Sequence, residues 1–185
     1  MPRRLATFVC LCGIVFAAQS SSIWLDVPFI KQEKDGCGSA TIAMVMQYWQ
    51  KQQPAANISE ADPDVIQLTL YSSKAHGIYA SDMERYLQQH AFATFSFHGK
   101  WDDLKQHLEK GRPLIVALKP LPAETALHYV VVVGLDREQN VVQVNDAAQR
   151  KLLKEDRSSF EKEWKAAGNW TLLALPQPTT SKATR

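Results

Sequence analysis

The chain of 185 residues has little cysteine, no long apolar run and no excess of either charge. Only three cysteines occur in it. Its apolar stretches all fall short of the roughly 20 residues that a membrane span needs. The 21 Lys and Arg residues nearly balance the 19 Asp and Glu residues, and no basic stripe interleaved with aromatic residues is present. We therefore expect neither an integral membrane span in the mature chain nor a nucleic-acid partner.

The first 20 residues have the pattern of an export signal. Arg3 and Arg4 precede an almost unbroken apolar stretch over residues 5–18, and small residues follow at the spacing that a signal peptidase accepts. An N-terminal anchor or a buried first helix is the alternative. We expect residues 1–20 to be cleaved and the mature protein to be secreted or periplasmic.

Removal of the signal leaves a chain of the usual length for one domain. We assign this domain to residues 21–176 and expect residues 177–185, which are polar and rich in proline, to be a flexible tail. Cys10 and Cys12 leave with the signal, so Cys37 is left alone and has no partner for a disulfide within its own chain. A single cysteine in an exported protein is a reactive thiol, an intermolecular link or a small buried apolar residue.

Apolar periodicity predicts helices in the first half of the chain and strands in the second. A short extended segment covers residues 23–30. Helices are expected from Gly38, after Asp62-Pro63, from Ser81 with a capping box, over residues 101–110 and over residues 158–167. Strands are expected over residues 113–119, 128–136, 140–146 and 169–175. This order is typical of an α+β fold with N-terminal helices packed on a C-terminal antiparallel sheet.

Cys37 is placed where a nucleophilic cysteine would be useful. It lies between Gly36 and Gly38, at the first turn of the first predicted helix. Unpaired N–H groups at a helix N-terminus favour a thiolate and can also stabilise an oxyanion. Two glycines allow a tight turn and a close approach by a substrate. A cysteine kept for packing would more naturally lie on the apolar face in the middle of the helix.

A thiolate needs a proton partner, and His128 is the best candidate among the five histidines. It begins the most apolar predicted strand, where the sheet fixes its backbone and its ring can reach the edge of a cleft. The strand after the expected hairpin ends in Asn145 and Asp146. Simple antiparallel register places this end beside His128. Successive side chains point to opposite faces, so only one of the two can orient the imidazole.

These residues resemble a known family. The stretch VPFIKQEKDGCGSATIAMVMQYW looks like the active-site opening of papain-like cysteine peptidases related to the bacteriocin-processing, double-glycine leader peptidases. HYVVVVGLD resembles the histidine strand of that family, and VQVNDA resembles the strand that ends in its aspartate. The likeness extends from Val27 to about Leu175.

The resemblance implies a papain-like fold and a role for each matching residue. Cys37 would be the nucleophile, His128 the general base and then acid, and Asp146 the residue that orients the imidazole. Gln32 would stabilise the oxyanion together with the backbone N–H of Cys37. A peptide or protein substrate is implied, and neither a cofactor nor a metal.

Three functions remain open on the sequence alone. The first is a peptidase that acts through a thioester. The second is an acyltransferase that uses the same thioester but passes the acyl group to an amine or thiol. The third is an inactive peptide-binding module of the same fold. A metal site on Cys37, His128 and Asp146 fits the pattern less well than a catalytic triad does.

Overall fold

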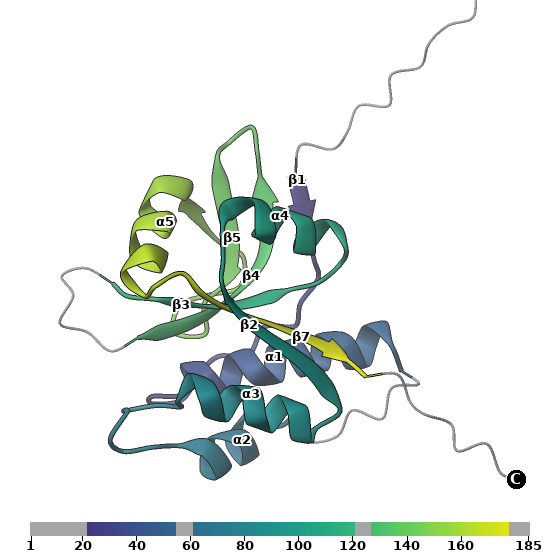
Figure 1. The fold of residues 1–185 in the computed structure, drawn as a ribbon, viewed down its shortest axis with the longest axis vertical. Helices are drawn as coiled ribbons and strands as arrows, with labels where there is room; N and C mark the ends of the chain where they lie inside the picture. The colour runs from purple at the N-terminus through teal and green to yellow at the C-terminus, as the bar shows by residue number, and fades with distance from the viewer. Residues whose placement is uncertain (1–21, 55–60, 121–126, 178–185) are drawn as a thin grey trace, which may run out of the picture.

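The computed structural model describes residues 22–54, 61–120 and 127–177. The predicted export signal and all of the predicted tail except Gln177 lie outside these residues. Within them the chain forms five helices and one seven-stranded sheet, so the predicted α+β fold class is confirmed (Figure 1). None of these helices is both long enough and apolar enough to cross a membrane.

Each predicted helix is present, and local chemistry explains most of the ends. The helices are α1 (Cys37–Gln52), α2 (Pro63–Leu70), α3 (Ala80–Gln89), α4 (Trp101–Glu109) and α5 (Arg157–Ala166). Asp62 caps α2 by accepting a hydrogen bond from the Asp64 N–H at 2.8 Å, with proline at the first helical position. After α4, Gly111 has a φ of 68°, the left-handed conformation that glycine adopts most easily at a helix end.

The predicted capping box at Ser81 is wrong. α3 begins one residue earlier, its N-cap is Tyr79, and no side chain caps it. Ser81 is therefore already inside the first turn of the helix. Glu84, the expected partner in the box, instead accepts a hydrogen bond from the Ser96 hydroxyl at 3.1 Å. A contact between α3 and the neighbouring strand has replaced the local cap.

All neighbouring strands of the sheet pair antiparallel, in the order β2-β7-β3-β4-β5-β6, and β1 pairs with β4. The predicted strands appear as β3 (Leu114–Leu118), β4 (His128–Asp136), β5 (Val141–Asn145) and β7 (Trp170–Pro176). β1 (Ser22–Trp24) lies at the start of the predicted extended segment. The structure adds β2 (Phe92–His98) and β6 (Leu153–Asp156) at the two ends of the order.

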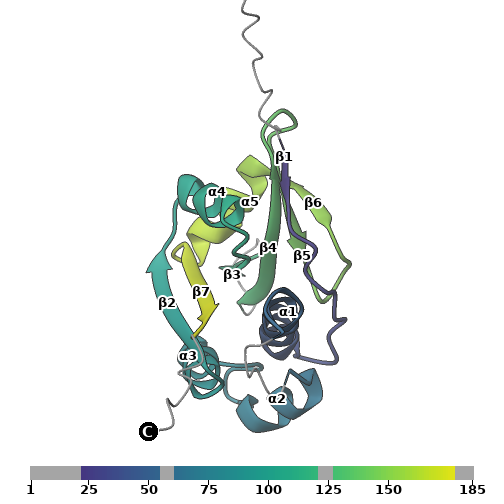
Figure 2. The same ribbon diagram turned by 90° about the vertical axis from the view of Figure 1, so that its right-hand side faces the viewer.

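The sheet separates two apolar cores (Figure 2). α1, α2 and α3 pack on one face, where Val131 and Val133 of β4 meet buried residues of α1. α4 and α5 cover the other face and contact Val130 and Val132, the alternate residues of the same strand. Along β4 and β5, alternate residues therefore point to the α1 face and to the α5 face. This alternation decides which side chains can meet at the end of the sheet.

The tight packing around Gly99, in the link between β2 and α4, gives a stability test. A Cβ atom on Gly99 would lie 2.6 Å from the Thr171 hydroxyl and 2.6 Å from the buried Trp164 ring. We expect Gly99→Ala to lower the free energy of unfolding by about 1–3 kcal/mol, because the core there has no room. Gly77→Ala is the matched control, since a Cβ there would lie 3.8 Å from its nearest neighbour, the Asp35 carbonyl oxygen. Equal melting temperatures for the two variants would contradict this account of the packing.

Candidate active site

Cys37 is the first residue of α1 and is half-buried. The chain turns immediately before it, where the Gly36 N–H donates to the Glu33 carbonyl at 3.1 Å. Asp35 in this turn has a positive φ of 57°. The helix N-terminus therefore presents Cys37 on its first turn, as the sequence predicts.

The glycines beside Cys37 have a packing role that the sequence did not show. A Cβ on Gly38 would lie 3.0 Å from the Cβ of Ile78, and a Cβ on Gly36 would lie 3.0 Å from the Glu33 carbonyl oxygen. Neither glycine has a positive φ. They allow the first turn of α1 to pack closely against its neighbours.

His128 and Asp146 are in direct contact. The Nε2 atom of His128 lies 2.8 Å from the Oδ1 atom of Asp146. The Asp146 side chain is only 4% exposed, against 21% for that of His128. Asp146 also accepts a hydrogen bond from the Ala148 N–H at 2.9 Å and one from the Gln149 side chain at 2.7 Å. The carboxylate is thus fixed by three donors when the imidazole is counted.

The contact between His128 and Asp146 forms although the pairing of β4 with β5 is not regular along its length. A register shift between Val132 and Gly134 pairs Val131 with Asn145. Continuing that register places Asp146 opposite Val130, two residues from His128 and on the same face of the sheet. The two side chains therefore meet diagonally, which is within reach for long side chains.

The pair Asn145 and Asp146 divides as side-chain alternation requires. Asp146 contacts His128, whereas Asn145 is fully buried on the other face. The Asn145 amide donates to the Val27 carbonyl at 3.2 Å and accepts from the Leu152 N–H at 3.0 Å. Asn145 therefore anchors the segment that leads to Gln32.

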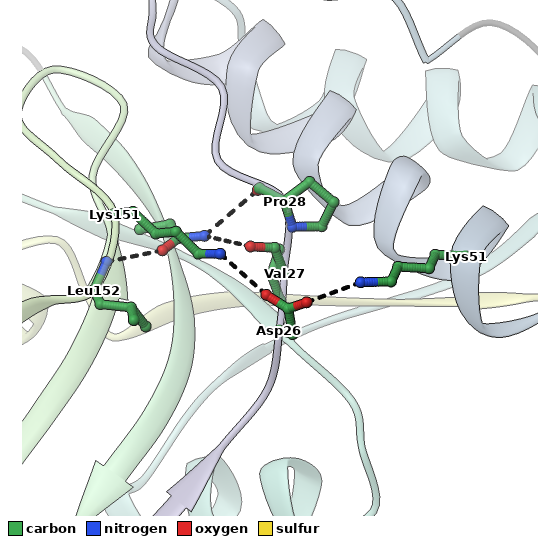
Figure 3. Close-up of polar contacts among 7 residues, drawn as sticks. Asp26, Val27, Pro28, Lys51, Lys151 and Leu152 are labelled. Carbon is green, nitrogen blue, oxygen red and sulfur yellow. Dashed lines mark hydrogen bonds and ion pairs between the residues drawn. The ribbon is translucent and has the colours of Figure 1, made fainter.

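An ion-pair bridge supports the same segment (Figure 3). Asp26 lies between Lys51 at the end of α1, at 2.8 Å, and Lys151, at 3.0 Å. Both lysines lower the pKa of the Asp26 carboxyl by hydrogen bonding and by charge. The bridge is solvent-exposed, so its energetic contribution is small, but it connects three separate parts of the chain.

Gln32 lies in the loop between this anchored segment and Cys37. Its backbone N–H donates to the Ala147 carbonyl at 3.0 Å, which places the loop beside the residue that follows Asp146. The side-chain Oε1 atom is buried and has no hydrogen-bond partner among the described residues. A buried unpaired acceptor costs about 1–3 kcal/mol. Such a group is expected where function rather than stability sets the environment.

The pKa of His128 depends on both Asp146 and Cys37. Burial lowers the pKa of His128, but hydrogen bonds to Asp146 and Cys37, and the charges of both, raise it to about 10. Because Nε2 faces Asp146, Nδ1 is the ring nitrogen left for the Cys37 thiol. Burial raises the pKa of Asp146, but the hydrogen bond and charge of His128, together with the hydrogen bonds from Ala148 and Gln149, outweigh it and the net shift is downward.

Two further titratable residues lie close to this site and were missed from the sequence. Burial and the charge of Cys37 raise the pKa of Tyr129 to about 12. Burial and the charges of Glu163 and Asp146 raise the pKa of Glu155 to about 7. The sequence did not indicate that either residue lies near the site. Tyr129 is in an apolar stretch, and Glu155 is in a segment that was not predicted to reach the site.

A cavity of about 340 Å³ opens beside the imidazole, and its lining includes both His128 and Asp146. Across the described part of the chain, no group of three or more His, Cys, Asp or Glu side chains is arranged to hold a metal ion. The arrangement supplies a thiol at a helix start, a base whose pKa the thiol raises and a carboxylate bound to that base. That set of groups can carry out nucleophilic acyl chemistry.

Comparison with known proteins gives one family match. The profile described as the Peptidase_C39 like family matches residues 24–172. Among curated proteins, none matches the chain significantly.

Solved structures share the fold at low sequence identity. A putative C39-like peptidase from Bacillus anthracis has a TM-score of 0.66 and 20% identity, over 84% of this chain and 98% of that one. A double glycine motif protease from an AMS/PCAT transporter, in complex with the leader peptide, has a TM-score of 0.63 and 20% identity, over 83% of this chain and 94% of that one. Xylellain, a cysteine protease from Xylella fastidiosa, has a TM-score of 0.63 and 13% identity, over 86% of this chain and 87% of that one.

The family profile covers most of the chain, and the resemblance inferred from the sequence is confirmed. The chain belongs to the Peptidase_C39 like family, and it has the fold of papain-like cysteine peptidases.

Proposed function

We propose that this chain is an exported peptidase that hydrolyses peptide bonds through Cys37, His128 and Asp146. The observation that carries the proposal is that His128 binds Asp146 at 2.8 Å while the pKa of the same ring is raised by Cys37 at the start of α1. A base held between a nucleophile and an orienting carboxylate is the arrangement that covalent acyl transfer needs. The leader peptide bound to a structural neighbour supports a peptide substrate.

The reaction has two halves. The Cys37 thiolate attacks the amide carbonyl, and the oxyanion accepts hydrogen bonds from the Cys37 backbone N–H and the Gln32 amide. The intermediate then breaks the C–N bond, His128 gives its proton to the departing amine, and a thioester remains on Cys37. In the second half His128 takes a proton from water, and the resulting hydroxide attacks the thioester. The acid product leaves and the thiol is restored.

Asp146 serves this cycle without exchanging a proton. Its carboxylate accepts from Nε2 of His128 and thereby holds Nδ1 toward Cys37. The three donors around the carboxylate keep it ionised, because each hydrogen bond favours the charged form. A fixed negative charge beside the ring favours the imidazolium that both halves of the reaction require.

Export is part of the proposal and is supported by the charged and apolar pattern of residues 1–20. Expression of the full chain in a bacterial host, followed by the intact mass of the exported protein, tests it. We expect a mature N-terminus near Ser20. Retention of the whole chain in the cytoplasm would contradict export and leave the chemistry of Cys37 unaffected.

Replacement of the nucleophile tests the chemistry. We expect Cys37→Ala to abolish release of peptides from an unfolded protein substrate such as casein, because no other group can form the thioester. The melting temperature should change little, since Cys37 is only half-buried. Peptide release by the variant at the wild-type rate would contradict the proposal. Release that depends on an added amine, with the amine found in the product, would instead identify an acyltransferase.

The role of Gln32 has a separate signature. We expect Gln32→Ala to lower kcat by about 10²–10³, the usual loss for one oxyanion donor. Alkylation of Cys37 by iodoacetamide should proceed at the wild-type rate, because that reaction forms no oxyanion. Gln139→Ala, in the exposed turn between β4 and β5, is the matched control. An unchanged kcat in Gln32→Ala would show that another donor binds the oxyanion.

A further inference from the structure

The cavity beside His128 is strongly acidic. Along with His128 and Asp146 it is lined by Glu155, Asp156 and Glu163, with the uncharged residues Leu118, Pro120, Gln149 and Ser159 completing the lining. Of the described residues that line it, only His128 can carry a positive charge. Cys37, by contrast, is not among these lining residues and packs with the core on the α1 face.

The two glutamates reach this cavity from the α5 face of the sheet. Glu155 of β6 pairs with Val142 of β5, and Val142 belongs to the core beneath α4 and α5. Directly paired residues share a face, so Glu155 lies on the α5 face. Glu163 is on α5, and its carbonyl accepts from the Lys119 N–H at 3.1 Å, which fixes α5 at the end of β3.

His128 lies at the boundary between the two faces. It has the same parity along β4 as Val130 and Val132, whose side chains pack beneath α4 and α5. Tyr129, with the opposite parity, packs in the core on the α1 face, where Cys37 also packs. By its parity the imidazole therefore lies on the side of the carboxylates, and Cys37 on the α1 face also raises the pKa of the ring.

The groups that face Glu155 come from every element around it. Glu163 faces it from α5, Asp146 from the end of β5 and His128 from β4, and Asp156 is its neighbour on β6. Asp156 is engaged in capping α5, where it accepts from the Ser158 N–H at 2.8 Å. Glu155 and Glu163 are therefore the two carboxylates of the cavity that neither cap a helix nor bind the imidazole directly.

We propose that Glu155 and Glu163 are positioning residues that act through His128, holding its ring protonated by their negative charge. The inference rests on the proposed function for its catalytic meaning. Transfer of a proton from Cys37 to His128 creates a thiolate and an imidazolium. The positive end of α1 stabilises the thiolate, and the two carboxylates on the opposite face stabilise the imidazolium. The N-terminus of α1 and the two carboxylates therefore both favour the state in which Cys37 is negative and His128 is positive.

The titration of the His128 ring tests this directly. In protein with ¹⁵N-labelled histidine, the His128 signals are assigned by their loss in His128→Ala. We expect the double variant Glu155→Gln/Glu163→Gln to lower the pKa of His128 by about one unit relative to the wild type. The high-pH limb of kcat/KM should move to lower pH by the same amount. Glu155→Asp should retain most of the wild-type titration, because it keeps the charge.

Two controls separate this effect from general changes. Glu161→Gln removes a carboxylate from the same helix, where it pairs with Arg157 at 3.2 Å and lines a different cavity. Glu138→Gln removes one from the exposed turn after β4. Neither should move the His128 titration. A double variant that titrates as the wild type would overturn the inference even if peptide cleavage is confirmed. A lowered pKa in a protein without peptidase activity would support the electrostatic inference and overturn the proposed function.

Discussion

The hydrogen bond between His128 and Asp146 is the interaction on which the site depends. It joins the start of β4 to the residue just after β5, and it buries a carboxylate that needs several donors to stay ionised. The ring orientation that results leaves one nitrogen for Cys37. If the bond were lost, the base would be free to rotate away from the thiol, and the buried carboxylate would lack its charged partner.

The rest of the fold brings three separate segments to this bond. α1 supplies Cys37 from one face of the sheet, and α5 and β6 supply carboxylates from the other. Asn145, the neighbour of Asp146, points the opposite way and anchors the segment before Gln32. The last residue of β5 and the residue that follows it therefore serve the two sides of the site, because side chains alternate along an extended chain.

Much of this arrangement could be predicted from the sequence. Apolar periodicity was sufficient to locate the helices and the central strands, since these elements bury continuous or regularly spaced apolar residues. The contact of His128 with Asp146 followed from the hairpin, although the two residues meet diagonally and not directly opposite each other. The register shift near Gly134 is needed for this contact, because the register nearer the turn would place Asp146 opposite Val131, on the α1 face. The family resemblance placed the same residues in one site.

What the sequence could not show depends on packing between distant segments. β6 reads Leu-Lys-Glu-Asp, a largely charged stretch without the apolar alternation that indicates a strand. Its pairing with β5 is what brings Glu155 to the cavity, so neither the strand nor the cavity was predicted. The cap expected at Ser81 failed for a related reason, because Glu84 found a partner in β2 that no local pattern reveals.

The proposed reaction requires that His128 activates Cys37. The rate of Cys37 alkylation by iodoacetamide at neutral pH, in the wild type and in His128→Ala, tests it most directly, with the modified residue mapped by mass spectrometry of the peptide that contains Cys37. We expect a rate at least about tenfold lower in His128→Ala, in line with the usual contribution of a positioned base. Equal rates in a variant that keeps the wild-type fold would show that the imidazole does not activate the thiol.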